Sequence, residues 1–157
     1  MRIAIVFYSF SGNTKRLSLF LKGMLEKKNH KVDMVEIKAE KEIKSFFRQV
    51  FCAFLKRKIP LEKVNINFDE FDLIIFATPV WAFTITPHLR TFLEDINLEG
   101  KKTACFVTFG SGAGAEKALK ELENILKSKK GEVLFSLKIK DKDTEDKNLL
   151  QKLNLPL

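Results

Sequence analysis

Three short segments of this chain are almost continuously apolar, and each is followed by a loop that carries hydroxyl groups. The segments are residues 2–8, 72–77 and 103–109. A strand in the middle of a parallel sheet is covered on both faces, so its sequence lacks the polar alternation of a half-exposed strand. The three segments therefore predict the central strands of a parallel sheet.

Segments with helical spacing of apolar residues separate these strands. Leu17, Leu21 and Leu25 fall on one face of a helix. Pro87 is placed to open another helix, with Thr86 as its cap. The remaining expected elements are outer strands over 31–37 and 132–139, a helix over 115–126 and a short final helix over 144–153.

Five alternations of strand and helix within 157 residues predict one α/β domain over 1–157. With right-handed crossovers, the economical arrangement is a doubly wound, five-stranded parallel sheet with helices on both faces. Ligands bind such sheets at the carboxyl ends of the strands, beside the point where the strand order reverses. The loops over 9–14, 78–86 and 109–114 are therefore the expected binding loops.

Charge and composition exclude several classes of protein. Residues 1–60 hold 14 Lys and Arg against five Asp and Glu, within a net charge of +8. This excess suits an acidic protein partner or a plain solvated Lys-rich surface. We find no zinc-finger spacing and no RNA-binding aromatic signature, so nucleic acid is not an expected partner. No apolar run approaches the roughly 20 residues of a membrane span, and the start does not fit a signal peptide. We expect a cytoplasmic protein.

Residues 41–58 combine helical spacing with four Phe and several basic residues. One interpretation is a crossover helix packed on the sheet; the other is a basic, aromatic helix that touches a membrane surface or a second subunit. Cys52 lies on this segment and is expected to fill space rather than to react. Cys105 lies in the middle of a strand and is expected to be buried and inert. Two cysteines make no disulfide framework.

The first loop lies between a buried strand and a helix and is rich in hydroxyl groups. It consists of Ser9, Phe10, Ser11, Gly12, Asn13 and Thr14. A helix N-terminus attracts phosphate through its unpaired N–H groups and its dipole, and Gly12 lets the backbone come close. The Gly-Lys-Ser/Thr step of triphosphate sites is missing. We therefore predict a site for one terminal phosphate; the alternative is that these side chains only cap the helix.

The second loop contains the only tryptophan of the chain. It runs through Thr78, Pro79, Val80, Trp81 and Ala82 toward the helix that begins at Pro87. A ring exposed at the carboxyl end of a strand offers a stacking face for a planar ligand. The alternative is a tryptophan of the core.

The third loop presents bare backbone groups, which fit the polar edge of a flat heterocycle. It consists of Phe109, Gly110, Ser111, Gly112, Ala113 and Gly114. Gly110, Gly112 and Ala115 also match the loose dinucleotide pattern G-x-G-x-x-A. The following strand ends in Lys138-Ile139-Lys140, without the acidic residue that a ribose would need.

Taken in order, the three loops resemble those of the flavodoxin-like FMN-binding proteins over essentially the whole chain. The resemblance implies a flavodoxin-like sheet with strand order 2-1-3-4-5 and FMN as the cofactor. By this resemblance Ser9, Ser11, Gly12, Asn13 and Thr14 hold the phosphate, Trp81 with Pro79, Val80 and Ala82 flanks the isoalloxazine, and Gly110, Ser111 and Gly112 line its pyrimidine edge. The neighbouring Phe10, Thr78, Thr108 and Phe109 complete the expected cofactor site.

Other residues depart from the electron carriers of that family. Residues 78–93 contain no Asp or Glu, whereas carrier flavodoxins place carboxylates around the flavin. Ala82 and Phe83 follow the tryptophan, and both raise the cost of a turn with positive φ. Arg90 is a candidate to face the flavin, and His88, the second residue of its helix, is expected at the surface.

Two functions follow from these observations. The leading hypothesis is electron transfer through FMN between protein partners, including an acidic, ferredoxin-like partner. The alternative is an NAD(P)H-dependent FMN reductase of quinones or similar small acceptors. In both the flavin supplies the chemistry, and no side chain has a clear acid, base or nucleophile role.

Overall fold

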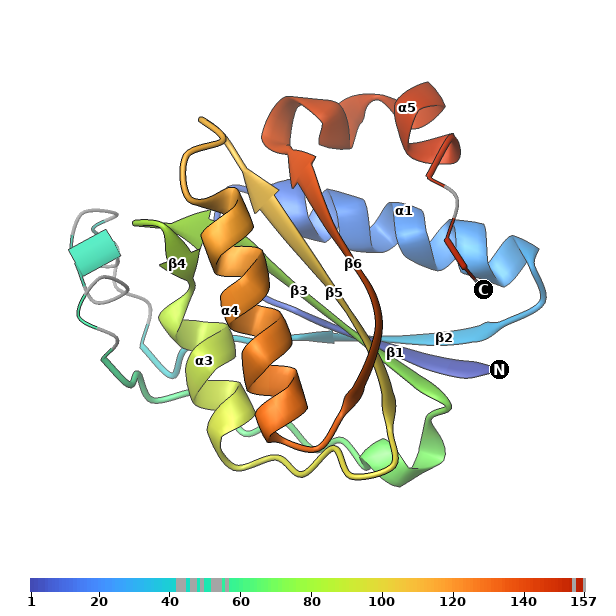
Figure 1. Cartoon of the computed structure of the whole chain (residues 1–157), viewed down its shortest axis with the longest axis horizontal. Helices are drawn as coiled ribbons and strands as arrows, with labels where there is room; N and C mark the ends of the chain where they lie inside the picture. Colours follow the sequence, from blue (N-terminus) through green and yellow to red (C-terminus); the bar gives the residue numbers. More distant parts are fainter. Residues whose placement is uncertain are drawn as a thin grey trace.

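The chain forms a twisted, mainly parallel sheet with helices on both faces (Figure 1). The computed structural model describes residues 1–41, 45, 48, 50–51, 55, 57–153 and 155–156. The strands are β1 (Arg2–Phe7), β2 (Lys31–Glu36), β3 (Leu73–Trp81), β4 (Thr84–Ile85), β5 (Lys102–Phe109) and β6 (Glu132–Lys140). The helices are α1 (Asn13–Lys27), α3 (Pro87–Glu94), α4 (Ala115–Ser128) and α5 (Lys147–Gln151), with short 3-10 helices η1 (Phe68–Glu70) and η2 (Asp141–Glu145).

The strand order confirms the predicted topology. The order is β2-β1-β3-β5-β6, with every neighbouring pair parallel, and β4 pairs with β3 outside this path. Without β4, this is the expected five-strand order 2-1-3-4-5. The chain winds in one direction from β1 to β2 and in the other from β3 onward. The order therefore reverses between β1 and β3, where a ligand site is expected.

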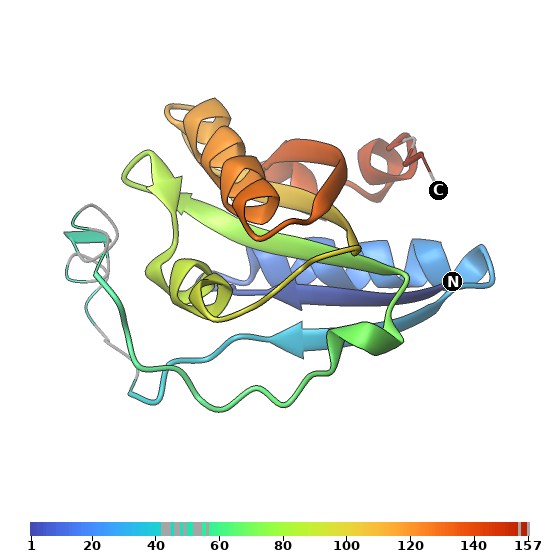
Figure 2. The same cartoon turned by 60° about the horizontal axis from the view of Figure 1, so that its bottom comes forward.

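Two cores explain why the central strands are apolar on both faces. Along β1, Ile3 and Ile5 face the core under α1 and α5, and Ala4 and Val6 face the core under α3 and α4. Figures 1 and 2 show these two helix layers on opposite sides of the sheet. The opening helix brings its expected face to the first core: Leu17, Leu21 and Leu25. Because both faces of these strands are buried, apolar side chains on either face are removed from water, and this explains their continuous apolar sequence.

Three predictions need correction or fall outside the described chain. Residues 78–86 are not all loop, because β3 continues to Trp81 and forms an antiparallel hairpin with β4. The final helix over 144–153 is shorter, α5 being preceded by η2. The helix expected over 41–58, with Cys52, lies largely outside the described residues. Cys105 is fully buried, as predicted, and burial raises the pKa of its thiol to about 12.

Candidate functional site

The first loop and the end of β5, which leads into the third loop, are joined by a buried contact between two threonines. The side-chain oxygens of Thr14, in the first turn of α1, and Thr108, near the end of β5, lie 2.8 Å apart. On the neighbouring strand, the Tyr8 N–H donates to the Ala77 carbonyl at 3.1 Å. The carboxyl ends of β1, β3 and β5 therefore bring the three expected loops to one edge of the sheet (Figure 1).

The first loop leaves the N-terminus of α1 open to an anion. Gly12 is the N-cap, with φ of 91°, and it supplies no side-chain hydrogen bond to the helix. Apart from its neighbours in the chain and the backbone of α1, no atom of the described residues lies within 4 Å of the position that a Cβ would take on Gly12. The first turn of α1 contains no acidic residue. Part of the capping alternative also holds, because the Lys15 N–H donates to Ser9 Oγ at 3.2 Å. The loop fits a phosphate group.

Trp81 does not present the exposed ring that the sequence suggested. Its exposed fraction is 6%, and its ring makes edge contacts with Tyr8 at 5.6 Å and with Phe10 at 5.7 Å between ring centroids. Phe10, in the first loop, is 46% exposed and occupies the more accessible place. Little of the Trp81 ring is therefore open to a stacking ligand in this structure.

His88 is buried beneath this aromatic group, contrary to the expectation of a surface residue. Its exposed fraction is 5%, and its ring stacks on Tyr8 with centroids 3.6 Å apart and planes 11° from parallel. Burial lowers the pKa of the imidazole to about 4. Its Nδ1 is buried and has no hydrogen-bond partner in the described part of the chain. His88 is therefore a neutral ring that supports Tyr8 and Trp81.

The hairpin turn after Trp81 adopts the conformation that its residues disfavour. Ala82 has φ of 46° and Phe83 has φ of 64°. These angles suit the two-residue hairpin in which Trp81 faces Thr84. Non-glycine residues in this region cost about 1–2 kcal/mol each, so the surrounding contacts must hold the turn. Phe83 is also 54% exposed.

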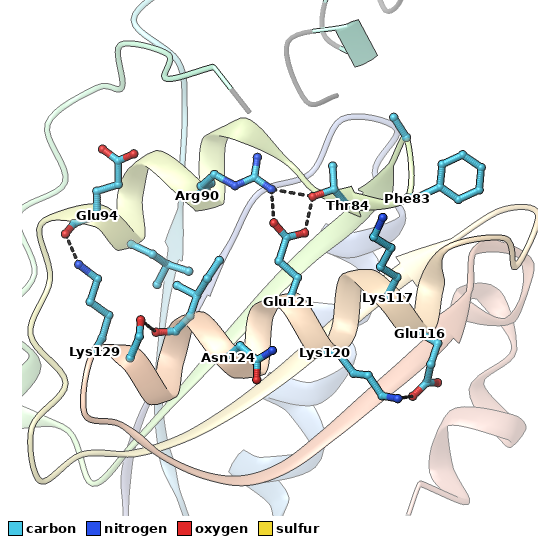
Figure 3. Close-up of a pocket in the computed structure, with 14 residues that line it drawn as sticks. Phe83, Thr84, Arg90, Glu94, Glu116, Lys117, Lys120, Glu121, Asn124 and Lys129 are labelled. Carbon is cyan, nitrogen blue, oxygen red and sulfur yellow. Dashed lines mark hydrogen bonds and ion pairs between the residues drawn. The ribbon is translucent and has the colours of Figure 1, made fainter. Parts of the chain in front are cut away.

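A charged group from α4 holds the second strand of the hairpin. Glu121 accepts hydrogen bonds from the Thr84 hydroxyl and, at 3.3 Å, from the Ile85 N–H. Its other oxygen pairs with Arg90 at 2.5 Å, and Arg90 also donates to Thr84 at 2.6 Å. Figure 3 shows these three side chains pointing toward one another, from α3, α4 and β4. Burial alone would raise the pKa of Glu121, but hydrogen bonds from Thr84 and Arg90 and the Arg90 charge hold it below its usual value.

A cavity of about 1140 Å³ lies between α3 and α4, beside this group (Figure 3). Of the expected cofactor residues it shares only Ala82. Its charged lining is mixed in sign, with Arg90 and three lysines facing three glutamates. The cavity therefore borders the second loop through Ala82, Phe83 and Thr84, and no residue of the first or third loop lines it.

The glycine-rich loop lies against the hairpin. A Cβ on Gly114, which has φ of 78°, would come within 2.5 Å of the Phe83 Cα. Gly112, with φ of 83°, packs its α-carbon toward the Phe109 ring, which would lie 3.6 Å from a Cβ. Only a residue without a side chain fits at Gly114, because the opposing atom belongs to the backbone. The hairpin and the third loop are thus in direct contact.

Two carboxylates of this region carry no local signal in the sequence. Glu121 lies in α4, on a helix whose sequence shows no feature that separates it from other surface glutamates. Asp141 lies directly after β6, and its Oδ2 would lie 3.6 Å from a Cβ on Gly110 in the third loop. Burial raises the pKa of Asp141, and the side chains of Asn13 and Thr108 oppose the shift. Both carboxylates reach the site through the sheet topology, which local patterns do not report.

Arg90 is paired with Glu121 rather than standing alone as a cation. The absence of acidic residues in 78–93 therefore does not describe the charge around the hairpin. Among the residues that the structure describes, no group of three or more His, Cys, Asp or Glu could hold a metal ion. Within that same part, no helix is long and apolar enough to cross a membrane.

Comparison with known proteins agrees with this architecture. Residues 1–136 match the family model described as NADPH-dependent FMN reductase. This match confirms the predicted resemblance to flavodoxin-like, FMN-linked proteins. No curated protein sequence matches the chain significantly.

Several solved structures are similar over nearly their whole length. A flavoprotein in complex with FMN from Lactobacillus acidophilus is 18% identical, with a TM-score of 0.74 over 94% of this chain and 98% of that chain. Oxidised flavodoxin 2 from Bacillus cereus is 21% identical, with a TM-score of 0.65 over 96% and 92%. A flavodoxin from the domain Archaea is 18% identical, with a TM-score of 0.62 over 96% and 94%. At these identities the likeness establishes the flavodoxin-like fold.

Proposed function

Because the chain belongs to the NADPH-dependent FMN reductase family, we propose that it binds FMN and reduces it with NAD(P)H. The electrons then pass to quinones or similar small acceptors. We place this reaction in the cytoplasm. The observation that carries the proposal is the N-terminus of α1, where the N-cap residue Gly12 supplies no side-chain hydrogen bond and the first turn contains no acidic residue.

The residues of the three loops fit the parts of FMN in order. The phosphate would lie on the loop Ser9, Phe10, Ser11, Gly12, Asn13 and Thr14. The isoalloxazine would lie between the hairpin residues Thr78, Pro79, Val80, Trp81 and Ala82 and the loop residues Thr108, Phe109, Gly110, Ser111 and Gly112. The flavin supplies hydride and electron transfer, and the protein sets its position and access.

The aromatic group gives the binding step a structural requirement. Phe10 contacts Trp81 in a T-shaped arrangement, and we propose that its ring moves when the flavin enters and then borders the ligand. His88 stays neutral above pH 4 and keeps the Tyr8 ring in place by stacking on it. Neither residue transfers a proton in this proposal.

A second candidate is electron transfer between protein partners. Flavodoxins are among the proteins of similar fold, and the basic excess of residues 1–60 suits an acidic, ferredoxin-like partner. The hairpin does not separate the two candidates, because its turn has positive φ despite lacking glycine.

Anaerobic mixing of the FMN-loaded protein with NADPH, and separately with NADH, tests the first candidate. We expect the absorbance of the oxidised flavin near 450 nm to fall after mixing with NADPH, because about two electrons enter each flavin. Dithionite serves as the control that shows the flavin can be reduced. Reduction by dithionite but by neither nicotinamide nucleotide would contradict the reductase and favour the carrier.

A further inference from the structure

The end of the edge strand β6 and the last helix form a second pocket beside the glycine-rich loop. Its volume is about 510 Å³, and Phe109, the first residue of that loop, lies in its wall. Figure 1 shows that β6 ends next to β5 and leads directly into η2 and α5. The pocket therefore lies next to the proposed isoalloxazine site, at the same edge of the sheet.

The charges in this pocket are predominantly positive. The one carboxylate among the described residues that line it belongs to Asp143, and it faces four lysines: Lys138, Lys140, Lys142 and Lys152. Lys138 is paired with Glu116 at 2.6 Å. The ammonium groups of the other three form no hydrogen bond or ion pair within the described part of the chain. Several unpaired cations around one space attract an anion.

The larger cavity between α3 and α4 differs in this respect, because three of its four cations are already bound. Arg90 is paired with Glu121, Lys120 lies 4.0 Å from a Glu116 oxygen, and Lys129 donates to the Glu94 carbonyl. Cations that the protein already satisfies offer less to a ligand. The comparison favours the pocket at the end of β6 as the anion site.

The same pocket also has an apolar wall. Leu149 in α5, which is 43% exposed, and Leu153 just after this helix line it together with Phe109. A flat heterocycle that carries a phosphate satisfies both parts, with its ring on the apolar wall and its phosphate among the lysines. The volume lies within the roughly 300–1000 Å³ of small-molecule pockets.

The sequence pattern that leads into this pocket has no role in the proposed flavin site. Gly110, Gly112 and Ala115 match G-x-G-x-x-A, and β6, the next strand, ends in Lys138-Ile139-Lys140. At the corresponding place, dinucleotide sites use an acidic residue for a ribose 2′-hydroxyl and a basic residue for a 2′-phosphate. We propose that the pocket binds the 2′-phosphoadenosine end of NADPH and thereby selects NADPH over NADH. The inference rests on the proposed reduction of FMN by NAD(P)H, with the nicotinamide end extending past Phe109 toward the flavin.

Adenosine 2′,5′-bisphosphate and 5′-AMP, which differ only in the 2′-phosphate, test the pocket without a redox step. Isothermal titration of the FMN-loaded protein at low ionic strength measures the dissociation constant of each. We expect the bisphosphate to bind about tenfold more tightly than 5′-AMP, because lysines form charge-assisted hydrogen bonds with the added phosphate. A double variant with Lys140→Gln and Lys142→Gln should bring this ratio close to one. Both side chains are exposed, so these substitutions should leave the fold intact.

A double variant with Lys117→Gln and Lys120→Gln is the matched control, because it removes the same charge from lysines of α4 that line the other cavity. It should keep the wild-type ratio. Equal losses in both double variants would assign the effect to net charge and overturn the proposal, as would a wild-type ratio near one.

Steady-state kinetics separate this proposal from the proposed function. The variant with Lys140→Gln and Lys142→Gln should raise the KM for NADPH about tenfold and leave the KM for NADH unchanged. Flavin reduction by NADPH together with a bisphosphate ratio near one would overturn the pocket alone. Tight binding of the bisphosphate without flavin reduction by either nucleotide would overturn the proposed reductase and leave the pocket as a nucleotide site.

Discussion

The phosphate loop and the hairpin stand at the same edge of the sheet, but they are held in opposite ways. The loop over 9–14 ends at a helix whose N-cap residue, Gly12, supplies no side-chain hydrogen bond, and Ser9 accepts a hydrogen bond from the Lys15 N–H. The hairpin at Ala82 and Phe83 is strained and packed, with Gly114 against its turn and Glu121 bonded to its second strand. One side of the proposed flavin site is therefore a helix start with an open glycine, and the other is a strained turn supported by tertiary contacts.

This difference indicates a division of labour within the proposed site. Open N–H groups can bind a ligand without rearrangement, so the first loop is suited to capture the phosphate. A strained turn persists only where its surroundings determine it, so the hairpin is suited to keep Trp81 in a fixed position. Changes on the hairpin side should alter stability, and changes on the loop side should lower affinity.

The largest effect is expected from Gly114→Ala. The new Cβ would lie 2.5 Å from the Phe83 Cα, and the residue would keep a φ of 78°. Overpacking and left-handed strain together should lower the free energy of unfolding by about 2–5 kcal/mol. Urea denaturation measures this change. Gly112→Ala is the control, with similar φ but an ordinary 3.6 Å contact to Phe109, and it should lose only about 1–2 kcal/mol. Equal losses in both variants would contradict a backbone contact between hairpin and loop.

Acid should weaken the hairpin side through His88. In the native state its pKa is about 4, against an ordinary 6.5. Below pH 6.5 the imidazole is therefore protonated in the unfolded chain but stays neutral in the native state. Stability should fall between pH 6.5 and pH 4 by about 3 kcal/mol from this residue alone, and His88→Phe should remove that part. Urea unfolding followed by Trp81 fluorescence reports it, since Trp81 lies 6.1 Å from His88 between ring centroids. A difference between wild type and His88→Phe that stays constant across this pH range would show that His88 titrates normally.

The sequence could predict the features that depend on local signals, but not those that depend on tertiary contacts. The strand order, the two helix layers and the phosphate loop depend on local signals: apolar runs, helical spacing and a glycine between hydroxyl residues. The buried state of Trp81 and His88 depends on Tyr8 and Phe10, which come from a different strand and loop. No local pattern reports such contacts. The positive φ of Ala82 and Phe83 could not be predicted either. Both residues disfavour this conformation, and contacts with α4 outweigh that preference.

On the loop side, Ser11→Ala should change affinity rather than stability. Ser11 is exposed and receives a hydrogen bond from Asn13 Nδ2 at 3.2 Å. A hydrogen bond from its hydroxyl to a charged phosphate would contribute about 1.5–3 kcal/mol to FMN binding, and nothing to riboflavin. Fluorescence titration of both flavins tests this. Equal weakening of the two ligands would show that Ser11 shapes the loop instead of binding phosphate.

The smallest effect is expected from Ala82→Gly, and its sign is what tests the comparison. Ala82 pays for a φ of 46°, a conformation that costs an alanine about 1–2 kcal/mol and a glycine almost nothing. Glycine also gains freedom in the unfolded chain, which opposes the benefit by about 0.5–1 kcal/mol. We therefore expect a net stabilisation of up to about 1 kcal/mol, measured by urea denaturation.

Ala113→Gly is the matched control, because Ala113 is exposed in the third loop and does not have positive φ. The same substitution there carries only the entropic cost and should destabilise the protein. If Ala82→Gly destabilises it to the same extent, the turn holds no strain, and the contrast between an open loop and a strained hairpin fails.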